Sequence, residues 1–221
     1  MIIDISVEKS NNKKIVSFYN KAIKDLDIFY QIKWNENMPM VFLIRSRKEY
    51  DTLYGHKTEQ WVVGSTMGSQ DKVYLLHPDV YEKESNHKYS DKEYETLLRH
   101  EISHLYSRMF YSNYKPIWLL EGIAIYSSGQ LELKRKVTEF STFLNFFDKG
   151  GGGVYDESGW AVLILDKEFG RKKLLKLLKS LNGFKDRKDF EKIFKKIYGI
   201  DLKYEWFNER VELTYSLGIP N

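Results

Sequence analysis

The segment His100-Glu101-Ile102-Ser103-His104 constrains the folding of this chain more than any other feature. Two histidines four residues apart lie on one face of an α-helix, so both imidazoles can bind a single metal ion. Glu101 starts from the neighbouring position and can reach a water molecule on the open side of that ion. Two ordinary helix histidines are the alternative, but that interpretation leaves the intervening glutamate unexplained. The spacing therefore predicts a helix that carries a metal site.

The residues around this segment also predict a helix. Ser90 and Glu93 have the spacing of a capping box, in which Ser90 is the N-cap and Glu93 reaches back to it. Apolar side chains then recur at helical spacing and form a stripe that we expect to be buried, namely Tyr94, Leu97, Leu98, Ile102, Leu105 and Met109. Both histidines consequently fall in the middle of the helix.

A catalytic zinc site needs a third protein ligand and an open position for water. Glu121 is the candidate, because it lies among apolar neighbours one turn after Pro116, which is well placed to open a second helix. A carboxylate buried there would be costly without a cation. A plain surface glutamate is the alternative, and the apolar residues on both sides of Glu121 argue against it.

The His-Glu-x-x-His segment and the later Trp118-x-x-Glu121-Gly122-x-Ala124 resemble the gluzincin zinc metallopeptidases, specifically the small peptidase MA-like group. The catalytic domain of bacterial collagenases carries a similar second motif. The resemblance extends over residues 13–181 and implies that His100, His104 and Glu121 bind zinc. Thermolysin-type gluzincins have an aspartate four positions after the glutamate ligand, and it supports a histidine. Ile125 stands at that position here, so the resemblance leaves this supporting residue unidentified.

The resemblance further implies hydrolysis of peptide bonds in a peptide or protein substrate. Zinc lowers the pKa of its bound water to about 7, and Glu101 would act as the general base that takes the water proton. Related peptidases usually use a tyrosine to donate a hydrogen bond to the developing oxyanion. Tyr155, which forms a Tyr-x-x-Ser pattern with Ser158, is our first candidate for this donor, and Tyr126 is the second.

The order of the apolar patterns predicts an α+β fold that forms one catalytic unit over residues 1–221. Residues 1–112 are expected to form an N-terminal α/β subdomain with a small twisted sheet and the metal-binding helix. Residues 113–221 are expected to form a mostly helical subdomain that carries Glu121. This division is typical of the peptidase class, and the resemblance therefore implies a zincin-like fold.

Local patterns place the individual elements. Strands are expected at 40–44, 61–64 and 72–77, with a turn at 67–71. Further helices are expected at 13–32, 47–54, 131–147, 158–181, 187–198 and 202–216. The glycine run at 150–153 is either a simple connector or a mobile loop near the site. In gluzincins the last strand before the metal helix is an edge that pairs with extended substrate, so 72–77 is the expected edge here.

Composition narrows the remaining possibilities. With 42% hydrophobic and 15% aromatic residues, the chain can fill a sizeable core. The sequence has no cysteine and thus gives no evidence of an oxidising compartment. The first residues lack a signal-peptide pattern, and the longest apolar run, 160–165, is far shorter than the ~20 residues of a membrane span. We expect a cytoplasmic protein, or a secreted one if a leader has been removed. His56 and His77 lack a paired spacing and are expected in loops or at the surface.

Two other functions remain open at this point. A relative that keeps the zinc site without catalysis would be a binding or scaffold protein. A nucleic-acid-binding protein is suggested by residues 166–196, where twelve Lys or Arg and five Asp or Glu give a net charge of +7, against −3 elsewhere. Lysines alternate with leucines there, which is typical of the solvated face of an amphipathic helix, so we expect no nucleic-acid partner.

Overall fold

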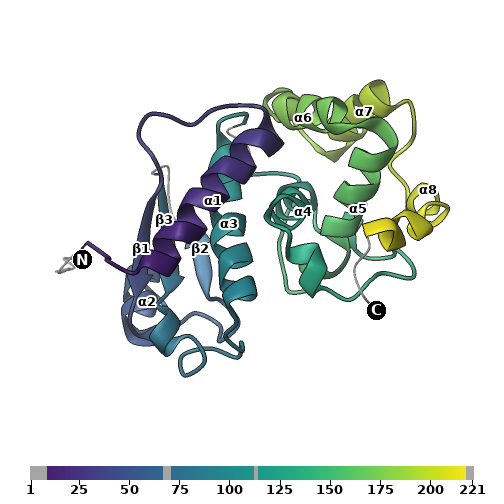
Figure 1. The fold of residues 1–221 in the computed structure, drawn as a ribbon. Coiled ribbons are helices and arrows are strands. Elements are labelled where there is room, and N and C mark those ends of the chain that lie inside the picture. Colours follow the sequence, from purple (N-terminus) through teal and green to yellow (C-terminus); the bar gives the residue numbers. More distant parts are fainter. Residues whose placement is uncertain (1–8, 67–70, 112–113, 218–221) are drawn as a thin grey trace.

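The computed structural model describes residues 9–66, 71–111 and 114–217 of the chain. It combines helices with a three-stranded sheet, which confirms the expected α+β class (Figure 1). The strands are β1 (Met40–Ile44), β2 (Gly64–Thr66) and β3 (Lys72–Leu76). The α-helices are α1 (Lys13–Tyr30), α2 (Arg47–Tyr54), α3 (Asp91–Arg108), α4 (Ile117–Ser128), α5 (Val154–Phe169), α6 (Arg171–Ser180), α7 (Arg187–Tyr198) and α8 (Tyr204–Asn208). Short 3-10 helices cover Pro78–Val80, Gln130–Leu133, Phe143–Asn145, Leu181–Gly183 and Val211–Leu217.

The strand order in the sheet is β1-β3-β2, with β1 parallel and β2 antiparallel to β3. The expectation that the strand at 72–77 forms an edge is therefore wrong, because β3 pairs on both sides. A parallel pair needs a crossover connection, and the chain from β1 through α2 and β2 provides it. The edge strand that packs against α3 is β2.

The strand expected at 61–64 begins at Gly64 instead. Side chains interact with the backbone carbonyls of Trp61 and Val62, which a strand would use for pairing. Arg47 donates from Nη1 to the Val62 carbonyl at 2.7 Å, and a ring nitrogen of His87 lies 3.0 Å from the Trp61 carbonyl oxygen. Ladder pairing with β3 starts only at Val63, whose carbonyl accepts from the Leu76 amide. Of the turn expected at 67–71, residues 67–70 lie outside the described residues.

Helices α1 and α3 lie side by side, and α4 packs against both of them between the sheet half and the later helices (Figure 1). A cluster of hydroxyl groups joins the three helices behind the histidine segment, with Tyr30, Ser103 and Ser107 buried and Ser127 half-buried. The Tyr30 hydroxyl lies 2.6 Å from Ser103 Oγ and 2.8 Å from Ser107 Oγ, and Ser103 Oγ lies 2.7 Å from Ser127 Oγ. Hydrogen bonds that are buried and mutually satisfied fix neighbouring elements strongly, so this cluster sets the position of α3 relative to α1 and α4.

Helices α4 and α5 approach more closely than a side chain would allow. A β-carbon on Gly122 would lie 2.5 Å from the Ser158 carbonyl oxygen, and one on Gly159 would collide with the Ile125 side chain. The small residues therefore permit a contact between the backbones of the two helices. This contact joins the helix that carries Glu121 to the helix that carries Tyr155.

The helix expected at 131–147 is absent from the described residues of that range, which contain only two short 3-10 helices. The buried carboxylate of Glu157 accepts hydrogen bonds from the amides of Ser141, Thr142 and Phe143 at 2.9–3.1 Å. A carboxylate that binds successive amides offers them an alternative to helical pairing, and it holds this segment as a loop against α5.

Two other expected helices are divided. The helix expected at 158–181 is broken at Gly170, whose φ of +81° ends α5 before α6 begins. The one expected at 202–216 consists of α8 and a 3-10 helix. Helix α6 buries its leucines and exposes Lys172, Lys173, Lys176 and Lys179, as the amphipathic interpretation predicts. Within the described residues, no helix combines the length and the apolar composition that crossing a membrane requires.

Candidate metal centre

Helix α3 forms where the local signals predict it. The Ser90 side chain accepts from the Glu93 amide at 3.1 Å. The second half of the expected capping box is replaced, because the Glu93 carboxylate accepts from Tyr81 and lies 3.0 Å from His87 Nδ1. The expected apolar stripe is buried except at Met109, which follows the last helical residue and is 48% exposed.

Helix α4 brings Glu121 toward α3. Pro116 is the residue before its first turn, and the amides of Ile117 and Trp118 donate to the carbonyls of Phe147 and Phe146. These two bonds satisfy amides that a helix start leaves free, and they hold the first turn in the core. Trp118 is fully buried, so the helix cannot rotate Glu121 away from α3 without exposing that ring.

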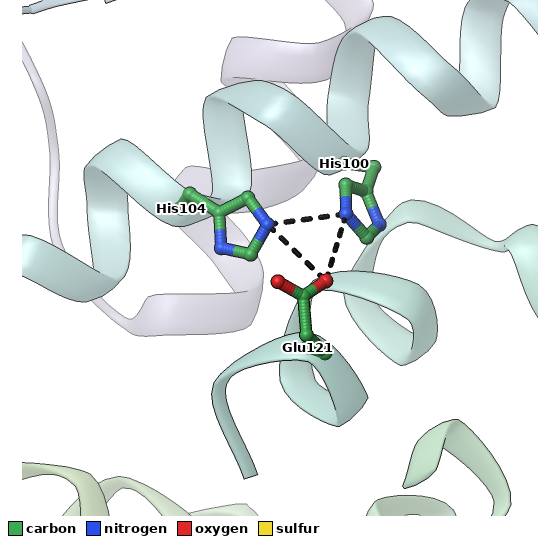
Figure 2. A group of neighbouring side chains, drawn as sticks. All are labelled: His100, His104 and Glu121. Atoms are coloured by element: carbon green, nitrogen blue, oxygen red, sulfur yellow. Dashed lines mark hydrogen bonds and ion pairs between the residues drawn. The ribbon is translucent and has the colours of Figure 1, made fainter. Parts of the chain in front are cut away.

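Three ligand atoms converge between these helices, as Figure 2 shows. The Nε2 atoms of His100 and His104 lie 3.1 Å apart, and Glu121 Oε2 lies 3.4 Å and 3.6 Å from them. Ligands about 2.0–2.1 Å from a tetrahedral ion are separated by roughly 3.3–3.4 Å. The three observed separations scatter around that value, so the donor set fits one small divalent cation.

Burial gives a second test of this fit. The side chains of His100, His104 and Glu121 are only 7%, 15% and 19% exposed. Glu121 Oε2 is buried, and no described residue forms a hydrogen bond with it. A buried carboxylate oxygen that lacks a hydrogen bond costs about 1–3 kcal/mol or more, even with the two imidazoles nearby, and a bound cation would remove that cost.

The charges in the site are coupled. Burial opposes ionisation of Glu121, but the two histidines outweigh it and hold the pKa of this carboxyl well below its usual range. Burial also disfavours charge on His104, yet Glu121 outweighs that effect and raises the pKa of this histidine. Without a cation, both shifts therefore favour an ion pair between Glu121 and His104.

Glu101 is buried beside this group and points to the sheet edge. A β-carbon on Gly64 of β2 would lie 2.9 Å from Glu101 Oε1. Burial raises the pKa of Glu101, and the two histidines oppose the increase. A carboxyl whose pKa is raised toward neutrality is suited to accept and return a proton.

The two tyrosine candidates lie in different surroundings. Tyr155 is half-buried at the start of α5, and its pKa is raised by burial and further by the charges of Glu121 and Glu101. Its proton consequently stays on the hydroxyl at neutral pH, which is what a hydrogen-bond donor requires. Tyr126 instead donates to Asp166 Oδ2 at 2.8 Å, a carboxylate that also pairs with Arg171. Its hydroxyl is therefore engaged away from the candidate metal centre.

Sequence reasoning missed three residues around the site. The Trp61 ring contacts the Tyr155 ring edge to face with centroids 6.1 Å apart. Lys134 Nζ lies 5.9 Å from the centre of the Tyr155 ring. Burial lowers the pKa of Lys134, and the charges of Asp156 and Glu121 oppose that shift. The third residue, Arg108, is one helical turn beyond His104 on α3. No motif marks these residues, and only the helical spacing of Arg108 from His104 could have indicated one of them.

The remaining histidines do not join the cluster. His77, which was expected at the surface or in a loop, lies in a loop but is 8% exposed, and its Nδ1 accepts from the Asp79 amide. The other ring nitrogen of His100, Nδ1, is buried and forms no hydrogen bond with the described residues. Ile125, at the position that gluzincins of the thermolysin type fill with aspartate, is fully buried.

Comparisons with family models, with curated proteins and with solved structures find no match to this chain.

Proposed function

We propose that this protein is a zinc-dependent metallopeptidase of the gluzincin type, similar to the peptidase MA-like group, that hydrolyses peptide bonds in peptide or protein substrates. The observation that carries the proposal is the convergence of His100 Nε2, His104 Nε2 and Glu121 Oε2 on one buried point between α3 and α4. Two imidazoles and one carboxylate form the ligand set of many zinc hydrolases. Bound zinc would supply a Lewis acid beside the scissile carbonyl.

The residues of the chain would divide the remaining work. Glu101 would take a proton from the attacking water and later return it to the leaving amine. Tyr155 would donate its hydroxyl proton in a hydrogen bond to the developing oxyanion, because its raised pKa keeps that proton in place. The edge strand β2 would hold the substrate backbone by strand addition, next to the Glu101 carboxylate.

Glu101→Gln tests this proposal with little change in volume. The zinc-loaded wild-type protein is expected to hydrolyse casein, and the variant is expected to retain zinc and lose activity by about a hundredfold or more. Glu139→Gln, at an exposed position away from the cluster, is the matched control and is expected to behave as wild type. Equal turnover in Glu101→Gln would reject Glu101 as the base. A wild-type protein that binds zinc but cleaves no casein would favour the binding or scaffold alternative.

A further inference from the structure

A cavity of about 220 Å³ opens beside the candidate metal centre. Its walls include His104 and Glu121 from the candidate metal centre, together with Thr66, Arg108, Tyr111 and Tyr114. Cavities that hold whole small molecules usually measure about 300–1,000 Å³. The size of this cavity therefore suits a single side chain or the end of a chain.

Arg108 is held in a fixed place in this cavity. It lies four residues after His104, so both side chains leave the same face of α3 one turn apart. Its Nη2 donates to the Thr66 carbonyl at 3.2 Å and to the Thr66 hydroxyl at 2.8 Å. The guanidinium carbon lies 5.5 Å from the centre of the Tyr114 ring. Thr66 at the end of β2 and the Tyr114 ring thus orient the guanidinium next to the candidate metal centre.

The charge of Arg108 reaches the groups around it. Burial raises the pKa of Tyr111 and of Glu101, and the guanidinium offsets part of each increase. Glu121 is the one carboxylate among the described residues of the cavity wall, and a divalent cation would more than neutralise it. With the cation bound, the cavity is positive, which favours an anionic group of the substrate.

We propose that this cavity is the specificity subsite of the peptidase, with Arg108 binding a carboxylate on a residue that flanks the scissile bond. The inference rests on the proposed function. The guanidinium keeps its positive charge over the whole working pH range and lies in the cavity wall, so it attracts a carboxylate there. That carboxylate belongs either to an Asp or Glu side chain or to the C-terminus of the substrate, and the experiment below distinguishes the two.

The test uses zinc-loaded full-length protein and internally quenched peptides that differ at one position. Glu, Gln or Lys is placed at each position flanking the scissile bond, with amidated C-termini, and a matching set ends in a free carboxylate one residue after the bond. We expect Glu to exceed Gln by about tenfold or more in kcat/KM at one position. Faster cleavage of only the free-acid set would assign the subsite to the chain end.

Variants of Arg108 separate charge from shape. Arg108→Gln is expected to bring the Glu-to-Gln ratio close to one, Arg108→Lys to give an intermediate ratio, and Arg108→Glu to favour the Lys peptide. The control is Arg45→Gln at an exposed position, where the wild-type ratio is expected. Zinc content and circular dichroism identify any variant that has lost its fold. If the Arg108 variants do not fold, the Glu-to-Gln ratio of kcat/KM for the wild-type protein decides the inference.

Two different failures can be told apart. Cleavage by the wild-type protein without preference for a carboxylate from either source, or an unchanged ratio in a folded Arg108→Gln variant, overturns the subsite and leaves the peptidase intact. Cleavage of no peptide and no casein rejects the proposed function. Carboxylate binding is then decided by NMR titration of the zinc-loaded protein with N-acetylglutamate amide against N-acetylglutamine amide, where equal binding of the two overturns it.

Discussion

Gly64 of β2 lies directly against Glu101 of α3, and a β-carbon added to Gly64 would lie 2.9 Å from Glu101 Oε1 and 3.0 Å from Glu101 Cγ. The edge strand thus approaches the carboxylate more closely than a side chain at this position would allow. A glycine in a strand often marks a place where another group approaches the backbone closely, and the contact with Glu101 explains its presence at the start of β2. The same proximity would bring a substrate strand paired with β2 within reach of Glu101.

Gly64→Ala is expected to displace either Glu101 or β2. The added methyl group would also lie 2.8 Å from Leu75 Cδ2, so the site is closed on two sides, and overpacking of this kind costs about 1–3 kcal/mol of unfolding free energy. We expect lower casein turnover with zinc content unchanged, measured beside a thermal melt. Gly183→Ala, where no atom lies within 4 Å of the added β-carbon, is the control. Normal turnover and stability in Gly64→Ala would contradict the packing described here.

Glu121→Ala is expected to weaken zinc binding by more than about a hundredfold, because even residues that only support a ligand contribute 10–100-fold. Elemental analysis after gel filtration and a competition titration with a chelator measure this loss. Glu132→Ala removes a carboxylate that is about half exposed and pairs with Lys92, and it is expected to retain the metal. Full zinc content in Glu121→Ala would remove this residue from the ligand set.

Tyr155→Phe and Tyr126→Phe form a matched pair of hydroxyl deletions. The first is expected to lower kcat by about a hundredfold with zinc content unchanged, as for other single oxyanion donors. The second removes a hydrogen bond to Asp166 and is expected to cost about 1 kcal/mol of stability with kcat retained. Steady-state kinetics and thermal melts on both variants check these expectations. If Tyr126→Phe lost activity and Tyr155→Phe did not, the two assignments would be reversed.

Zinc affinity is expected to fall as the pH decreases. In the metal-free protein Glu121 raises the pKa of His104 above its ordinary 6.5, despite the opposing effect of burial. The ion must displace that proton, so protons begin to compete with zinc at a pH above 6.5. Below that point the apparent zinc affinity falls by up to about tenfold per pH unit for each proton displaced. In Glu121→Gln the raised pKa is lost, and the decline should begin at lower pH. Chelator competition between about pH 5.5 and 8.5 measures both curves, and a flat wild-type curve would contradict this coupling.

Local signals were sufficient to predict the helix that carries the two histidines. The Ser90 cap and the apolar repeat lie within the helix itself, so the sequence alone predicts that His100 and His104 share a face. The partnership with Glu121 was harder to predict, because it depends on the packing of α4 on α3. There the apolar neighbours of Glu121 gave the correct indication that this carboxylate is shielded from solvent.

Failures occurred where a distant side chain takes over backbone groups. The segment 131–147 has helical periodicity, yet the Glu157 carboxylate binds its amides from α5. Trp61 and Val62 have the composition of a strand, yet His87 and Arg47 engage their carbonyls. Arg108 and Lys134 were missed for a related reason, since each is ordinary in sequence and acquires meaning only from neighbours on other elements.

The close contact of Gly122 with the Ser158 backbone has a mechanical consequence. Helices that meet through their main chains cannot slide past each other without a collision, so we expect α4 and α5 to move together. Tyr155 would then move with Glu121, whereas His100 and His104 lie on α3. A displacement of α3 relative to α4 and α5 would therefore change two things at once: the separation of the three candidate ligands and the distance from the Tyr155 hydroxyl to them.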